Sequence, residues 1–193
     1  MPWEKRFDID QTLNRAMEAF WARGFEATSM QDLVDVTGVN RASLYATYGD
    51  KRDLFLAALR RYDSEVRRRL LDELGARETP PRAVAAVFDK FIRQVTQPDG
   101  NWGCFLINSA LELAPHDPEI AAMVNSAQDD IEAFFLAMIR KGQQSGDFPE
   151  QLDATYLARQ GLVTVLGLVV MIRSRPEEAY LHAIRDGFLS RLT

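Results

Sequence analysis

The side chains best suited to recognition chemistry lie in the short segment NRASLYATY, residues 40–48. Arg41 carries a guanidinium, which can pair with the edge of a guanine through two parallel hydrogen bonds. Asn40, Ser43 and Thr47 add polar groups at a spacing that brings them to one face of a helix. Such a face is small and polar enough to enter the major groove of DNA. The segment therefore indicates direct reading of base edges.

A helix-turn-helix would hold that face outward. Residues 29–48 read as a helix, a turn containing Gly38 and a second, shorter helix. Glycine permits a tight turn because it adopts backbone conformations that other residues avoid. An apolar seam would join the two helices, and it is formed by Leu33, Val34, Val39 and Leu44. This arrangement lays its second helix in the major groove.

Polar residues that cap helices predict where these helices begin. Thr28 or Ser29 can cap the second helix, Asn40 the third and Asp50 the fourth. Asp53 follows Asp50 by three positions, as a capping box requires. The third helix is then very short, which suits a reading element.

The stretch GFEATSMQDLVDVTGVNRASLYATYGDKRDLFLAAL resembles the N-terminal domain of the TetR family of transcriptional regulators over its whole length. The matching positions are Gly24, Thr28, Ser29, Leu33, Gly38, Val39, Leu44, Tyr45, Tyr48, Lys51, Leu54 and Phe55. The sequence departs from the family pattern at Ala42, where glycine or proline is common, and at Tyr48, where phenylalanine is common. The resemblance implies a DNA-binding domain over residues 1–60.

The resemblance also implies which residues contact DNA. They are Thr28, Ser29, Met30, Asn40, Arg41, Ala42, Ser43, Tyr45, Thr47, Tyr48 and Lys51. Thr28 and the amides that begin the second helix would bind a phosphate at the positive helix end. Arg41 would read a guanine, while Tyr45 and Lys51 would bond phosphates. Tyr48 would lie at the groove edge, or alternatively in the core.

The charge balance limits how this domain can bind. Residues 1–60 contain eight Lys or Arg and nine Asp or Glu, and the whole chain carries a net charge of −5. This argues against a protein that coats nucleic acid non-specifically. We expect few phosphate contacts per chain, so that affinity depends on two linked half-sites. The basic residues at 60–61 and 67–69 are expected on a solvated surface rather than on DNA.

Helical periodicity dominates the chain, and no strand pattern is visible. The fold class is all-α with about nine helices: an N-terminal three-helix helix-turn-helix domain and a helical domain, residues 61–193, for effector binding and dimerisation. Beyond the fourth helix, which begins at residue 50 and extends to about 74, helices are expected near 82–96, 103–113, 118–145, 154–174 and 177–192. The segment 75–81 would be a linker.

The last two helices are the candidates for a dimer interface. Residues 154–172 are apolar nearly all round, so this helix needs neighbours on several sides. A four-helix interface made by two chains meets that need better than an intrachain core does, and the resemblance implies the same. The expected interface residues are Leu162, Leu166, Val170, Leu181, Ile184 and Phe188.

Large rings and a few polar groups mark the middle helices. Rings of this kind usually belong to a core. The resemblance implies that some of them line a pocket for a small, partly apolar effector. The candidates are Phe88, Phe91, Trp102, Cys104, Phe105, Asn108, Glu112, Phe135 and Arg159.

Cys104 is the single cysteine and follows Gly103 at the expected start of a helix. A helix N-terminus stabilises a thiolate, so one hypothesis is a thiol that senses oxidants or electrophiles. This part of the chain weakly resembles an electrophile-responsive branch of the family. A small buried residue that happens to be cysteine is the favoured alternative. A lone cysteine also suits a reducing compartment.

Other function classes find little support. The two histidines, His116 and His182, are expected at the surface, and no nucleophile constellation, metal-ligand spacing or phosphate loop is recognisable. We expect no enzyme activity, catalytic residue, metal or cofactor. Met1–Phe7 lacks an apolar signal core, and the uncharged run 160–172 is shorter than the ~20 residues that span a bilayer.

Together these features predict a cytoplasmic homodimer that binds a palindromic operator in double-stranded DNA. It would act as a repressor released by its effector, without a membrane partner. Activation stays open. The alternative function is a helical ligand-binding module that does not bind DNA.

Overall fold

The computed structural model describes residues 7–97 and 100–193, so the segment before Phe7 that was considered for a secretory signal lies outside the described residues. The α-helices are α1 (Ile9–Arg23), α2 (Met30–Thr37), α3 (Arg41–Tyr48), α4 (Lys51–Tyr62), α5 (Arg69–Arg77), α6 (Pro80–Ile92), α7 (Phe105–Glu112), α8 (Pro118–Ser145), α9 (Ala154–Ser174) and α10 (Glu178–Leu189). A π-helical turn, Asp63–Arg68, joins α4 to α5, and short 3₁₀ turns follow α6 and α10.

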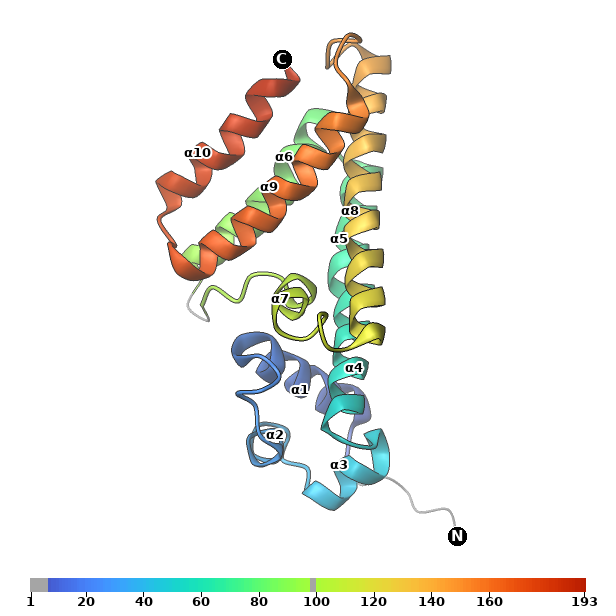
Figure 1. The fold of residues 1–193 in the computed structure, drawn as a ribbon, viewed down its shortest axis with the longest axis vertical. Coiled ribbons are helices and arrows are strands. Elements are labelled where there is room, and N and C mark those ends of the chain that lie inside the picture. The colour runs from blue at the N-terminus through green and yellow to red at the C-terminus, as the bar shows by residue number, and fades with distance from the viewer. Residues whose placement is uncertain (1–6, 98–99) are drawn as a thin grey trace.

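The helices form two regions connected by a long rod (Figure 1). The rod consists of α4, the π-helical turn and α5, and it runs beside α8 along the long axis of the molecule. Helices α1, α2 and α3 gather around one end of the rod, while α6, α9 and α10 lie at the other end. α7 lies between the two regions. Counted with the rod as one helix, the described residues form nine helices and no strand, which confirms the all-α prediction.

The predicted caps are present at the helices that carry the N-terminal region. The Asn40 side chain accepts a hydrogen bond from the Ser43 amide at 2.9 Å. Ser29 and Asp50 each form a capping box with the aspartate three positions on. Gly38 ends α2 in the left-handed conformation, with a φ of 71°. These local signals fix α3 as a helix of eight residues between two breaks.

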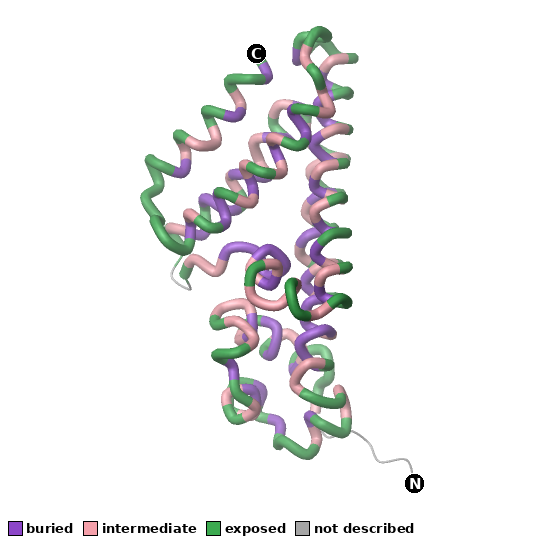
Figure 2. The backbone as a smooth tube through the Cα atoms, in the orientation of Figure 1, coloured by how far each residue is buried: buried purple, intermediate pink, exposed green. Residues whose placement is uncertain are grey.

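A continuous apolar core runs through both regions, as the buried stretches in Figure 2 show. Phe55 of α4 is at its centre near the N-terminal end. Its ring lies edge-on to Phe20 at 5.0 Å and to Phe25 at 5.1 Å between ring centroids, and edge-on to Phe105 of α7 at 5.2 Å. The N-terminal bundle and the middle of the chain therefore share packing instead of meeting through a loose linker.

Two sequence predictions for the rod are corrected. The helix continues to Arg77 and α6 begins at Pro80, so most of the predicted linker 75–81 is helical. Gly75 lies inside α5, where an added Cβ would be 3.7 Å from the Phe134 ring. Arg67, expected on a solvated surface, is 5% exposed. It pairs with Asp63 and with Asp130, which is 63 residues away in sequence. Because this second partner is distant in sequence, the burial of Arg67 could not be predicted from the residues around it.

Candidate nucleic-acid interface and effector cavity

Helix α3 lies at the extremity of the molecule, away from the C-terminal helices (Figure 1). Its inner side is anchored by Leu44, which is 1% exposed. Arg41 and Ala42 on the outer side are exposed, and so is the capping residue Asn40. Among residues 7–97 and 100–193, Arg41 has no hydrogen-bond or ion-pair partner. Of the face predicted from the sequence, Asn40 and Arg41 are therefore open to solvent, whereas Ser43 and Thr47 are half-buried.

The two tyrosines of α3 occupy different positions. Tyr45 is 43% exposed, beside the outer face. Tyr48 is half-buried, and its hydroxyl donates to the backbone oxygen of Ile9 at 3.0 Å. Burial raises the pKa of Tyr48, so its hydroxyl stays protonated. Tyr48 ties α3 to α1, which agrees with the core alternative, and Thr47 beside it is also half-buried.

The start of α2 departs from the prediction at one residue. Thr28 is 0% exposed, and its hydroxyl donates to the backbone oxygen of Gly24 at 2.7 Å. Its side chain therefore cannot reach a phosphate in this conformation. Ser29 is exposed and Met30 half-buried at the helix start, so the backbone amides there remain the candidate phosphate ligands.

Lys51, the first residue of α4, lies next to this helix end. Its ammonium group is 4.2 Å from the centroid of the Phe25 ring, in the segment that leads into α2. A cation over a ring face is held by electrostatic attraction. The contact orients the one positive charge expected to bind a phosphate beside the reading helix.

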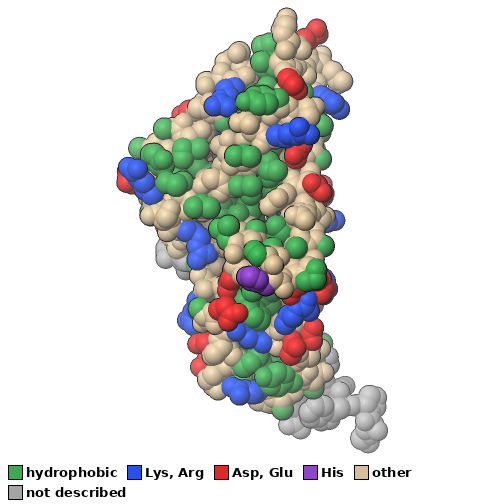
Figure 3. All heavy atoms as spheres, in the orientation of Figure 1, with side chains coloured by type: hydrophobic (Ala, Val, Ile, Leu, Met, Phe, Trp, Pro, Cys, Tyr) green, Lys and Arg blue, Asp and Glu red, His purple; other side chains and the backbone are tan. Residues whose placement is uncertain are grey.

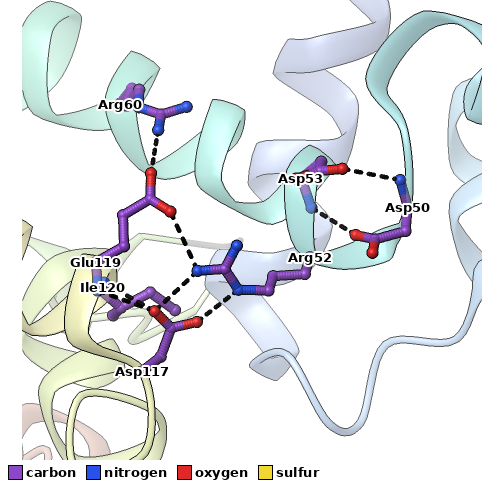
Figure 4. Close-up of polar contacts among 7 residues, drawn as sticks. All are labelled: Asp50, Arg52, Asp53, Arg60, Asp117, Glu119 and Ile120. Carbon is purple, nitrogen blue, oxygen red and sulfur yellow. Dashed lines mark hydrogen bonds and ion pairs between the residues drawn. The ribbon is translucent and has the colours of Figure 1, made fainter.

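Two polar clamps connect this region to the rest of the molecule. In the first, Arg52 of α4 bonds both carboxylate oxygens of Asp117, at 2.6 and 2.9 Å, and reaches Glu119 at 3.1 Å (Figure 4). Arg60, about two helical turns farther along α4, also pairs with Glu119. The Arg52 guanidinium lowers the pKa of Asp117 to about 2, so the clamp is fully charged at neutral pH. It joins α4 to the start of α8.

The second clamp involves Glu112, which the sequence analysis assigned to the effector pocket. Its carboxylate instead accepts hydrogen bonds from the backbone amides of Phe25 and Glu26, at 3.2 and 2.9 Å. A Cβ at Gly24 would lie 2.8 Å from the same carboxylate, so glycine allows this close approach. The end of α7 is thus tied directly to the loop before α2.

A small cavity of about 30 Å³ lies between the rod and the C-terminal helices. It is lined by Trp21, Tyr62, Val66, Arg67, Leu70, Leu71, Val87, Lys90, Phe91, Gln94, Cys104, Ile131 and Val165. Of the predicted pocket residues, only Phe91 and Cys104 are in this lining. Trp21, Tyr62 and Arg67 were not predicted for the pocket, because their positions depend on how α1 and the rod pack against α6.

Three predicted pocket residues belong to the packed core. Phe88 lies 5.6 Å from Phe135 and 5.3 Å from Phe188 between ring centroids, and all three rings are at most 3% exposed. Phe105 is 1% exposed in the aromatic cluster around Phe55. These rings hold helices together and are not part of the lining of the cavity described above.

The remaining predicted pocket residues lie apart from the cavity. Asn108 donates to the backbone oxygen of Trp102 at 2.8 Å, which orders the turn before α7. The Trp102 ring lies edge-on to Trp21, 5.4 Å between centroids. Arg159 is exposed on α9 and pairs with Glu132 at 3.3 Å. Asn108 and Trp102 thus lie together, and Asn108 also lines an open hollow with Glu112, whereas Arg159 lies apart from both.

The chemistry of Cys104 differs from the sensing hypothesis. The residue is 2% exposed, immediately before α7. Burial raises the pKa of the Cys104 thiol, although hydrogen bonds from the Tyr62 hydroxyl and from the amides of Ile107 and Leu106 act in the opposite direction. The thiol is therefore protonated at neutral pH, and the favoured alternative of a small buried residue fits the structure better.

The outer face of α9 carries large hydrophobic side chains without intrachain cover, namely Tyr156 at 54%, Val163 at 59% and Val170 at 45% exposure. Hydrophobic side chains gather on this part of the surface in Figure 3. Gly167 lies on the same side of α9 and has no neighbour within 4 Å of where a Cβ would be. This face of α9 is exposed to solvent in the single chain.

Not every predicted interface residue belongs to this face. Leu162, Leu166 and Ile184 are half-buried and Val170 is exposed. Leu181 at 0% and Phe188 at 3% exposure are instead buried within one chain, on the side of α10 that packs against α9 and α6. The apolar stripe of α10 therefore packs α10 against α9 and α6 within the same chain.

By length and composition α9, with 21 residues, is apolar enough to span a membrane, although its uncharged part, residues 160–172, is shorter than a bilayer span. Core helices of water-soluble proteins pass the same test. Here α9 packs against α8, α10 and α6, and seven of its residues are buried inside the bundle.

Comparisons with known proteins agree with these features. Residues 13–58 match the family described as "Bacterial regulatory proteins, tetR family", and residues 80–188 match "Tetracyclin repressor-like, C-terminal domain". The chain is 37% identical over 156 residues to the "Uncharacterized HTH-type transcriptional regulator YezE" of Bacillus subtilis, covering 80% of each protein. It is 33% identical over 170 residues to the "HTH-type transcriptional repressor ComR" of Escherichia coli, covering 88% of this chain and 81% of that protein.

A solved structure resembles the whole chain. It is a cysteine mutant of the TetR family transcriptional regulator CifR, complexed with 26-bp double-strand operator DNA. The identity is 26%, the TM-score is 0.85, and 98% of each chain is covered.

Proposed function

The chain belongs to the TetR family of bacterial transcriptional regulators, and from this premise we propose that it is an operator-binding repressor, active as a homodimer and released by a small effector. The observation that carries the proposal is the exposed outer face of α3, with Arg41 unpaired among the described residues at the extremity of the molecule. ComR, similar over most of its length, is named a repressor, and the CifR relative was solved on operator DNA.

The proposed DNA contact has three parts. Arg41, with Ala42 and Ser43 beside it, faces base edges in the major groove. Tyr45 and Lys51 bind phosphates on either side, and the amides that begin α2 bind another. Asn40, Thr47 and Tyr48 position the helix at the groove edge. Residues 1–60 form the DNA-binding domain and residues 61–193 the effector-binding and dimerisation domain.

A dimer would present two such helices. We assign the interface to the exposed face of α9, with Leu162, Leu166 and Ile184 at its margin and α10 beside it. Three large apolar side chains open to solvent on one helix are costly for a monomer and typical of a contact surface.

Sedimentation of variants tests this interface. Val163→Asp is expected to yield a folded monomer. Thr155→Asp, which adds the same charge at a half-buried position near the start of α9, is the control. A dimer that persists in Val163→Asp contradicts this assignment.

Effector release needs a path from the cavity to α3. Trp21 of α1 and Tyr62 at the end of α4 both line the cavity, and α1 and α4 pack together in the DNA-binding bundle. The clamps of Arg52 and Glu112 connect the same bundle to α8 and α7. A ligand that widens the cavity would therefore displace α3 relative to its copy in the dimer.

Selection of bound duplexes from a random DNA pool tests the proposal. We expect a palindromic consensus with half-site centres about one DNA turn apart, ~34–36 Å. Repression in the cytoplasm would be supported if the consensus lies in the promoter of the gene that encodes this protein and if transcription from that promoter falls when the protein is present. Failure to enrich any sequence, from protein that is folded and dimeric, would favour the alternative of a ligand-binding module without DNA binding.

A further inference from the structure

The cavity beside the rod contains a buried cation with an unused donor. Arg67 is 5% exposed; its Nε donates to Asp63 at 2.5 Å and its Nη2 to Asp130 at 2.7 Å. Its Nη1 is fully buried and, among the described residues, has no hydrogen-bond partner. Buried hydrogen-bond donors are nearly always paired, so an unpaired donor in a cavity wall indicates that a bound ligand supplies the acceptor.

A second unused donor lines the same cavity from the opposite domain. The indole Nε1 of Trp21 is also fully buried and has no partner in the described part of the chain. Its ring is held edge-on against Tyr62, 4.8 Å between centroids. The indole N–H and the guanidinium Nη1 can only donate hydrogen bonds, so a ligand that pairs with both must carry hydrogen-bond acceptors.

The charges around the cavity favour an anion. Arg67 and Arg68 are balanced by Asp63 and Asp130, with which they form a four-membered ion-pair cluster. Lys90, in the cavity lining, adds one further positive charge. Hydrogen bonds to ionised partners are the stronger ones, and arginine suits planar carboxylates in particular.

The rest of the wall is apolar and limits the body of the ligand. Most of it consists of Val66, Leu70, Leu71, Val87, Phe91, Ile131 and Val165, and the remaining lining residues are Tyr62, Cys104 and Gln94, whose side-chain amide is bonded to the backbone of Gly103. We propose that the cavity binds a small monocarboxylic acid with a compact aromatic or branched body, whose carboxylate accepts hydrogen bonds from Arg67 and Trp21. This deepens the proposed function by naming the effector class, and its effect on DNA rests on that function, whereas the binding itself does not.

The site must widen to admit such an acid, because a cavity of about 30 Å³ has room for about one water molecule. The π-helical turn Asp63–Arg68 is where this can happen. It carries Val66 and Arg67 and lies between α4 and α5. π-helical turns interrupt the regular bonding of a helix and often mark functional sites. Rearrangement there would shift α4, and with it α3, while Trp21 transmits the same displacement to α1.

Paired acids and amides of equal shape test the ligand class. Acetate, isobutyrate, benzoate and phenylacetate are titrated into the full-length protein beside acetamide, isobutyramide, benzamide and phenylacetamide. Binding is read from tryptophan fluorescence and calorimetry. We expect at least one acid to bind saturably and at least tenfold more tightly than its amide. If no acid binds more tightly than its amide, the proposal is wrong.

Conservative variants test the two donors. Arg67→Lys keeps the charge that balances Asp63 and Asp130, and Trp21→Phe keeps the aromatic packing while it removes the N–H. Each is expected to weaken the best acid at least tenfold, whereas Arg69→Lys, at an exposed pair with Glu73, should not change it. Wild-type affinity for the acid in both folded variants would overturn the assignment. If Arg67→Lys does not fold, the affinity of Trp21→Phe alone tests it.

Gel shifts with the selected duplex separate this inference from the proposed function. We expect the unliganded protein to bind DNA and the best acid to weaken that binding. Normal DNA binding without any acid preference refutes the acid site alone. Acid binding by a protein that binds no DNA refutes the regulator and leaves the acid site standing.

Discussion

Replacement of Arg41 by alanine separates base reading from folding. Arg41 is the first residue of α3, is exposed, and makes no polar contact within the described residues. The cap between Asn40 and the Ser43 amide does not involve its side chain. Surface substitutions of this kind change stability by about 0.5 kcal/mol or less. We therefore expect Arg41→Ala to unfold at the wild-type temperature.

The loss of operator affinity is expected to be large. A bidentate pair between arginine and guanine contributes about 1–3 kcal/mol of discrimination. A dimer makes the contact twice, so the loss is about 2–6 kcal/mol. At about 1.4 kcal/mol per factor of ten, binding weakens by about 30-fold to about 20,000-fold.

Fluorescence anisotropy with the selected duplex, repeated at several salt concentrations, measures this effect. Loss of a base contact should leave the salt dependence unchanged and relax the preference at one guanine in each half-site. Arg140→Ala, an exposed arginine on α8, is the control with the same net charge. Wild-type affinity in Arg41→Ala, or an equal loss on every duplex with a shallower salt slope, would refute base reading by Arg41.

Three further predictions concern a phosphate contact, the core and a clamp. Lys51→Ala should reduce the salt slope of DNA binding by about 2 per dimer, measured by the same titrations, and an unchanged slope would exclude its phosphate contact. Gly161→Ala should lower the free energy of unfolding, measured in urea, by about 1–3 kcal/mol, because a Cβ there would lie 2.9 Å from the Phe135 ring. Gly75→Ala should raise this free energy by about 0.5–1 kcal/mol, because alanine is the better helix residue and its Cβ would meet no atom closer than 3.7 Å. Because Asp117 has its pKa lowered from 3.8 to about 2, its stabilising charge is present above pH 3.8 and lost as the pH falls through 2. Asp117→Asn should therefore flatten the acid unfolding curve between these pH values in circular dichroism, and an unchanged curve would show that the clamp does not stabilise the fold.

The elements that present the reading face were predictable because their signals are local. Asn40 and Asp50 cap the helices that follow them, and each cap bonds an amide only three residues away. Gly38 supplies the left-handed residue that the turn needs. Such signals depend on neighbouring residues alone, so the sequence contains them in readable form.

The cavity and the clamps were not predictable, because they depend on residues far apart in the chain. Glu112 bonds amides 86 and 87 positions away, which turned a predicted pocket residue into a structural link. Arg67 is buried where its guanidinium meets Asp130 of α8, 63 residues farther along the chain. The presence of large rings does not distinguish a ring that lines a cavity from one that fills the core, and Phe88, predicted for the pocket, belongs to the core. The π-helical turn has no sequence signal that we recognise.

The most direct test of the account changes the distance between the two half-sites in DNA. Insertion of five base pairs at the centre of the selected palindrome rotates one half-site by about half a helical turn relative to the other. If two α3 helices bind as a linked pair, affinity should fall to that of a duplex with a single half-site. Affinity equal to that of the uninterrupted palindrome would contradict the proposal that a symmetric pair of α3 helices recognises the operator.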